Sequence, residues 1–385
     1  MVIKQSTLVK GCVITAVLAS QVAPLQTFAA EQNQIVEQDS TEAVISSALQ
    51  ELGTQTVLLK TYALTLLKQP TVTIAAMPDL GSYQDKAKEH ARYWLDTVQP
   101  SLIDANQQLI DFQQKTQNYY STLIELAKQI DTNPTAKQDF ITGMTKLQES
   151  LSNHENQIKS MSSNLQQFQK QFDTDAQNFI NASITVQKSL AEKDGEIAQL
   201  TKQIQTLNSD ITAQIGLIVG GTIGMIAGIG AITLGTIALF STGGTTIPVI
   251  LPMLGGIVAG TGGLLAGGIT VGFAAKKLDD KRKEIQETMQ KLENDKAAAA
   301  TLSLLKGQIE TFKTTLETGK DSVEAFDTSW HELQQNVIDL DNDVKKSNPD
   351  SAVLQSRLAQ IKKSVDDLAS QAIQQEKVIT DISYQ

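Results

Sequence analysis

The sequence lacks charge over one long stretch. From Ile211 to Ala275 there is no Asp, Glu, Lys, Arg or His. The same stretch holds 17 of the chain's 24 glycines. A helix that crosses a bilayer needs about 20 mainly apolar residues. The stretch is therefore long enough for two such helices with a turn between them.

Cysteine is almost absent, since Cys12 is the single one in the chain. It lies within residues 1–30, which have the pattern of a secretory signal peptide: Lys4 and Lys10 precede a short apolar run, and small residues near Ala29 offer a cleavage site. Lys10 stands directly before Gly11-Cys12, which argues against a lipoprotein signal. We expect a mature, secreted chain with no disulfide and no thiol chemistry.

Positive charge is also scarce. The net charge is −10, and it becomes −12 without Lys4 and Lys10. This balance argues against nucleic acid as a partner and against simple docking on anionic lipid. The sequence carries no HExxH, P-loop or GxSxG motif. It therefore predicts no enzyme, no cofactor and no metal site, and it places His90, His154 and His331 on the surfaces of polar helices.

Outside the uncharged stretch, apolar residues recur every three or four positions, which predicts long amphipathic helices. The expected fold class is mainly α, an elongated bundle of about five long helices with an apolar insertion. A short strand is expected at Val72–Ile74, and Pro100 is expected to kink a helix. The predicted helices are 41–68, 83–130, 136–210 with a weak point at Asp194-Gly195, 302–344 and 351–381. The predicted segments are 1–30 (signal), 31–210 (first part of the bundle), 211–275 (hairpin) and 276–385 (second part of the bundle).

The uncharged stretch divides into two arms. Ile211–Phe240 and Val249–Ala275 are each long enough to cross a bilayer with some tilt, and a polar, turn-rich tip joins them. Small residues four apart let helices approach closely in lipid. The predicted helix-packing residues are Gly216, Gly220, Gly224, Gly228, Gly256, Gly260, Gly263 and Gly267, and the predicted tip residues are Gly243, Gly244 and Pro248.

The many glycines weaken an isolated helix in water by about 1 kcal/mol each relative to alanine. We therefore expect short strands and helices against the bundle in water, and two helices in lipid, where every backbone group must be satisfied internally. The tip carries no Lys or Arg, which favours spontaneous insertion over a permanent anchor. One rival is a resident membrane protein whose extracellular coiled coils scaffold or tether a partner. The other is a soluble helical binding module whose apolar segment is only core.

Short motifs in a fixed order resemble a known family. They are Tyr93-Trp94-Leu95-Asp96, Gln99-Pro100-Ser101-Leu102-Ile103, Asn118-Tyr119-Tyr120, the uncharged hairpin, and Ser329-Trp330. In this order they resemble the haemolysin BL and non-haemolytic enterotoxin family, which is related in fold to cytolysin A. The resemblance runs from about Ile45 to the C-terminus.

The resemblance implies a secreted α-helical pore-forming toxin subunit whose head stows the apolar segment, in some members as a β-tongue. It also implies that the subunit inserts this segment into the bilayer of a target cell, and that it oligomerises there, with other copies or with different partner subunits. Residues Leu52-Gly53, Tyr62–Pro70 and Gln360–Lys363 look like one subunit type of the family. The long hydrophobic hairpin looks like another, the membrane-spanning type.

Overall fold

The structure is a computed structural model. It describes residues 33–190, 195–222, 231–242, 245–254, 280–281, 283–288, 294–346, 350–381 and 383–384. The chain divides into two compact units, Met1–Asp39 and Ser40–Gln385. The account below concerns the second unit, which holds almost all of the described residues.

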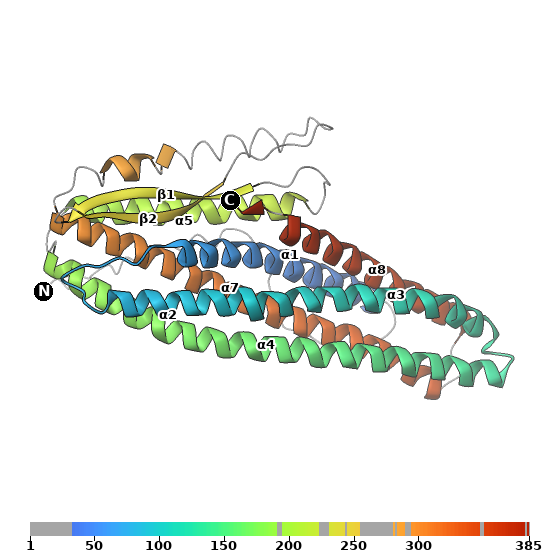
Figure 1. Cartoon of the computed structure of the whole chain (residues 1–385). Helices are drawn as coiled ribbons and strands as arrows, with labels where there is room; N and C mark the ends of the chain where they lie inside the picture. The colour runs from blue at the N-terminus through green and yellow to red at the C-terminus, as the bar shows by residue number, and fades with distance from the viewer. Residues whose placement is uncertain are drawn as a thin grey trace, which may run out of the picture. The chain divides into compact units, whose positions relative to one another are not determined.

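The fold is mainly α, as the sequence predicts. The helices are α1 (Asn33–Lys68), α2 (Leu80–Tyr93), the π-helical η1 (Trp94–Val98), α3 (Gln99–Gln129), α4 (Pro134–Leu190), α5 (Gly195–Thr222), α7 (Asn294–Lys346) and α8 (Ser351–Asp381). The strands are β1 (Ala231–Thr242), β2 (Thr245–Leu254) and β3 (Ser383–Tyr384). Along the chain, β1 and β2 come between α5 and α7, and β3 follows α8 (Figure 1).

The core of the bundle is formed by the stripes of apolar residues that the sequence repeats every three or four positions. Helix α4 packs most extensively against α7, and α3 packs against α8 and α4. The aromatic rings of Phe172 and Phe312 meet across α4 and α7 with centroids 4.8 Å apart. Both side chains are fully buried. The apolar stripes predicted from the sequence are therefore the contact surfaces of a helical bundle.

Helix α1 is buried on all sides over part of its length: almost every residue from Leu52 to Leu66 is buried, with Lys60 and Leu64 partly exposed. The hydroxyl of Tyr62 donates to Asn208 Oδ1 of α5 at 3.2 Å. A Cβ placed on Gly319 of α7 would lie 3.5 Å from Gln55 Cβ of α1. This part of α1 is therefore surrounded by other elements, among them α5 and α7.

Two helix boundaries differ from the sequence prediction. Helix α1 begins at Asn33 instead of near Thr41. Pro100 lies in the first turn of α3, directly after the π-helical turn Trp94–Val98. A proline lacks an N–H and crowds the carbonyl one turn earlier. The wider π turn makes room for this ring, so the chain runs from α2 through η1 into α3 where the sequence predicted one kinked helix.

The structure also tests a predicted short strand and a predicted weak point in the long third helix. The predicted strand at Val72–Ile74 is wrong: Ile74 forms an isolated bridge with Met77, and the segment is otherwise a loop that buries the side chains of Val72 and Ile74 and exposes that of Thr73. Near the predicted weak point at Asp194-Gly195, α4 ends at Leu190 and α5 begins at Gly195, while residues 191–194 lie outside the described ranges. The single 136–210 helix therefore becomes two helices.

Candidate functional site: the stowed apolar hairpin

The centre of the uncharged stretch is a β-hairpin. Strands β1 and β2 pair antiparallel from Ile232 opposite Leu254 to Thr242 opposite Thr245, with one irregularity between Leu239 and Ser241. The last pair, Thr242 opposite Thr245, flanks the predicted tip residues Gly243 and Gly244, which lie outside the described residues, whereas Pro248, also predicted at the tip, is paired within β2. The sequence left open whether this segment is strand or helix in water, and the structure makes 231–242 and 245–254 strands.

The prolines of β2 determine the hydrogen-bonding pattern of the hairpin. Pro248 lies opposite Ala238, and Pro252 lies opposite Leu234. Because proline has no N–H, these two positions must be ones at which the backbone nitrogen of β2 points away from β1. The pairs 238/248, 236/250 and 234/252 are therefore the non-hydrogen-bonded ones, in which side chains approach most closely. The same prolines leave gaps in the row of donors on the outer edge of β2.

The hairpin is stowed on the helical body. β1 contacts α7, and β2 contacts α7 and α5 (Figure 1). A second contact comes from the end of the chain, where β3 pairs parallel to β1, with Ala231 opposite Ser383 and Ile232 opposite Tyr384. The described sheet has the order β2-β1-β3. The strand that begins the hairpin is therefore held between its own partner and the residues that follow α8.

No helix within the described ranges is both long enough and apolar enough to cross a membrane. The C-terminal part of helix α5 carries the start of the uncharged stretch, from Ile211 to Thr222. The remainder of the first predicted arm that the structure describes is strand. The predicted arms Ile211–Phe240 and Val249–Ala275 are therefore not two helices in this structure.

The predicted site residues fall into three groups. Gly216 and Gly220 lie four residues apart in α5, and Pro248 lies in β2. The predicted packing residues Gly224, Gly228, Gly256, Gly260, Gly263 and Gly267, and the predicted tip residues Gly243 and Gly244, lie outside the described residues. Helix packing by these glycines stays a prediction.

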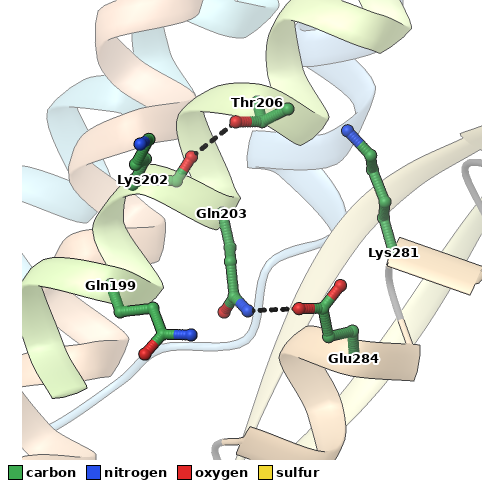
Figure 2. A pocket seen from close by; sticks show the side chains of 6 residues that line it. All are labelled: Gln199, Lys202, Gln203, Thr206, Lys281 and Glu284. Carbon is green, nitrogen blue, oxygen red and sulfur yellow. Dashed lines mark hydrogen bonds between the residues drawn. The ribbon is translucent and has the colours of Figure 1, made fainter.

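Two side-chain contacts join the residues just before the uncharged stretch to those just after it, and the sequence did not predict them. We call this region the neck of the hairpin. Lys281 Nζ lies 2.5 Å from Asp210 Oδ2, and each side chain is 25% exposed. Gln203 Nε2 donates to Glu284 Oε1 at 2.6 Å. Figure 2 shows Gln203 of α5 and Glu284 pointing toward each other across a pocket that Lys281 also lines. The sequence did contain a sign of the ion pair: Asp210 and Lys281 carry opposite charges and lie on either side of the uncharged stretch.

Two of the three histidines do not lie on the surface, contrary to the sequence prediction. The side chain of His331 is 60% exposed, as predicted, but that of His90 is only 13% exposed, and His154 is buried at 7%. Burial, assisted by the charge of Lys115, lowers the pKa of His154. His154 packs edge-on against Phe112 and Trp330, which places it among α3, α4 and α7. It is therefore part of the core.

His90 joins α2 to α4. Its Nε2 lies 3.0 Å from Asp175 Oδ2, and Lys86 Nζ donates to Asp175 Oδ1 at 2.8 Å. Burial raises the pKa of Asp175, but hydrogen bonds from Lys86 and His90 outweigh it, so that the pKa lies below its usual value. The two histidines therefore serve the packing of the bundle, far in sequence from the hairpin.

Comparisons with known proteins agree with this architecture. The family model for the Bacillus haemolytic enterotoxin (HBL) matches residues 39–214. A Bacillus cereus protein, described as an uncharacterized protein in the hblA 3' region, is 30% identical in an alignment of 125 residues that covers 29% of this chain and 79% of that protein.

Solved structures share the fold over most of the chain. The Bacillus cereus HblL1 toxin component has a TM-score of 0.69 at 22% identity, covering 88% of this chain and 96% of its own. SmhB, from a tripartite α-pore-forming toxin of Serratia marcescens, has 0.68 at 15%, covering 90% and 94%. AhlB, from a tripartite α-pore-forming toxin of Aeromonas hydrophila, has 0.67 at 19%, covering 89% and 94%.

The class of protein is thus defined first by the fold, a helical bundle with a stowed apolar hairpin, which is the fold of soluble components of α-pore-forming toxins. The sequence comparisons then place the chain more narrowly. It belongs to the Bacillus haemolytic enterotoxin family. The resemblance drawn from the short motifs is confirmed, and the chain is a subunit of the pore-forming toxin type.

Proposed function

We propose that the chain is a secreted subunit that inserts residues 211–275 into the bilayer of a target cell and assembles there with partner toxin subunits. The observation that carries the proposal is the hairpin itself: an uncharged, glycine-rich segment stowed as a sheet on α5 and α7. The related HblL1 is a toxin component, and SmhB and AhlB belong to tripartite toxins. These relationships support the proposal that this chain acts together with different subunits.

The stowed hairpin must refold before it enters lipid. An open sheet leaves unpaired backbone N–H and C=O groups along its edges, and hydrocarbon offers no partner for them. A helix satisfies these groups within one segment. We infer that α5 extends from Thr222 through the residues of β1, and that the second helix begins near Leu251, with Pro252 in its first turn. Proline is well accommodated in the first turn of a helix, where its missing N–H is not needed.

The refolded arms lie side by side in this proposal. Gly216 and Gly220 lie on one face of α5, and a continuous helix adds Gly224 and Gly228 to the same face. Such small residues allow close helix contact in lipid, where no hydrophobic force drives association. Gly243 and Gly244 form the uncharged tip that crosses first. The action is physical and involves no catalysis, cofactor or metal.

Site-specific fluorescence tests this proposal. A chain with Cys12→Ser carries a single cysteine at Ile237 in β1, labelled with a polarity-sensitive dye. A matched chain carries it at Asn133, an exposed residue between α3 and α4. Phosphatidylcholine–cholesterol vesicles are added with the chain alone and with other haemolytic enterotoxin subunits. We expect a blue shift and quenching by lipid-phase quenchers at residue 237 only. A dye at 237 that stays in water while the vesicles leak contradicts insertion of this segment.

A further inference from the structure

The two ends of the uncharged stretch are tied together by side chains. Asp210 is the last charged residue before the stretch, and Lys281 lies shortly after its end. Their ion pair of 2.5 Å and the 2.6 Å hydrogen bond from Gln203 to Glu284 connect α5 to residues 280–288. We call these two contacts the neck clasp.

The clasp holds two helical segments antiparallel. Residues 280, 281 and 283–288 are helical, as is α5. From Gln203 to Asp210 the chain advances along α5, while the partners run backward from Glu284 to Lys281. Antiparallel neighbours joined at one end are also the arrangement that a helical hairpin requires.

Both sides of the clasp are anchored in the bundle. Ile211 is 1% exposed and Ile285 is fully buried, and both belong to the continuous apolar core. The main contacts of the stowed strands with other elements are to α7, α5 and β3, and the clasp residues belong to none of these strands. Refolding of the hairpin can therefore proceed without disturbing the neck.

We propose that the neck clasp persists during insertion and sets the register between the two arms as they become helices. The proposal rests on the insertion of residues 211–275 argued above. Closing a long flexible segment costs conformational entropy, and a clasp that is already formed in the soluble state removes that cost from the insertion step. The charged groups of the clasp stay at the water interface, because the hydrocarbon excludes them.

Replacing the charged residues tests the clasp, because the proposal predicts that dye release becomes slower and not faster. Asp210→Asn and Lys281→Gln each remove one partner, and we expect either to slow dye release from phosphatidylcholine–cholesterol vesicles about fivefold, the effect of losing one partly buried ion pair. The exchanged pair, Asp210→Lys with Lys281→Asp, is expected to restore the rate. Lys202→Gln is the control, since it removes a positive charge from the same pocket but lies outside both contacts.

Faster release by the single variants contradicts the proposal, because it makes the contact a lock that must open. Unchanged release, or an exchanged pair that fails to recover, also contradicts it. Circular dichroism confirms folding of each variant before it is compared.

A chemical crosslink provides the independent measurement. With Cys12→Ser, cysteines at Gln203 and Glu284 are joined in the soluble protein by a short thiol-reactive crosslinker. We expect the crosslinked chain to release dye at the rate of the uncrosslinked double variant. Loss of release on crosslinking overturns the proposal, because it means that the neck must separate. If the wild-type chain with its partner subunits releases no dye, and the dye attached at residue 237 of the cysteine variant shows no blue shift with vesicles, the proposed insertion itself is wrong, which is a different result.

Discussion

Gly307 of α7 is a close-approach position whose replacement by alanine we expect to destabilise the docking of α5. A Cβ at residue 307 would lie 3.0 Å from Ile204 Cγ2 and 3.3 Å from Asn208 Nδ2. Asn208 also donates to the carbonyl of Gly307 at 3.4 Å and accepts a hydrogen bond from Tyr62. The methyl group therefore enters the junction of α1, α5 and α7.

The magnitude follows from two opposed effects. Alanine gains about 1 kcal/mol over glycine inside a helix. Overpacking of a filled core costs about 1–3 kcal/mol. We expect Gly307→Ala to lower the free energy of unfolding by about 1 kcal/mol, taking the middle of that range.

Gly319 of the same helix is the matched control. There the nearest atoms to an added Cβ lie at 3.5 and 3.7 Å, which is ordinary contact. Gly319→Ala is therefore expected to gain about 1 kcal/mol of helix stability. Urea unfolding followed by circular dichroism measures both changes as shifts of the midpoint. If Gly307→Ala stabilises the protein as much as Gly319→Ala does, the close packing of α5 on α7 is refuted.

Three further predictions concern pH and the hairpin. Because burial lowers the pKa of His154 below its ordinary 6.5, the unfolded chain takes up a proton near that pH that the folded chain does not, so stability falls as the pH drops through 6.5. Urea midpoints at pH 7.5 and 5.5 should therefore fall more for wild type than for His154→Gln, and equal losses would contradict the assignment. Gly220→Ile with Gly224→Ile should leave the soluble fold unchanged by circular dichroism and abolish vesicle permeabilisation, so undiminished leakage argues against a glycine packing face. Gly244→Lys adds a charge that costs about 2.5–3.5 kcal/mol at mid-bilayer, so leakage should slow, and an unaltered rate means that the tip does not cross.

The bundle could be predicted from the sequence because its apolar residues are spaced for helices over very long runs. Phe140, Phe168 and Phe326 belong to these apolar repeats, and each is at most 1% exposed. The start of α8 at Ser351 and the end of β1 at Thr242 could also be predicted, because proline, glycine or asparagine residues stand next to each of them in the sequence. These signals are local, so one sequence is enough to find them.

The π-helical turn before Pro100 could not be predicted in the same way. Proline signals that the regular helix pattern is interrupted, but a kink, a break and a wider turn all accommodate its ring. The buried state of His154 was missed for a related reason. A lone histidine in a polar helix gives no sign of facing Trp330 and Phe112, since those residues come from other helices.

The secondary structure of the hairpin was open in the sequence because its composition suits two environments. Residues such as Ile232, Ile237 and Val249 favour strands, while the glycines weaken a helix in water. In lipid the requirement for internal hydrogen bonds reverses the preference. The neck clasp was missed because its charged partners, Asp210 and Lys281, are separated in the chain by the whole uncharged stretch.

Refolding of the hairpin from strands to helices is the central claim, and a double staple tests it most directly. In a Cys12→Ser chain, cysteines replace Thr236, Ile250, Ala238 and Pro248, which form two successive cross-strand pairs. Non-hydrogen-bonded pairs have Cα atoms about 4.5 Å apart, within the range of a disulfide. On a helix, residues two apart point about 200° apart, so both bridges cannot reach a neighbouring helix at once.

The measurement is dye release from vesicles by the oxidised and the reduced forms of this one protein, with partner subunits present. The account predicts that the oxidised form stays soluble and releases no dye, and that reduction restores release. Equal release by the oxidised and reduced forms would contradict it, because the hairpin would then act while both staples hold it as strands.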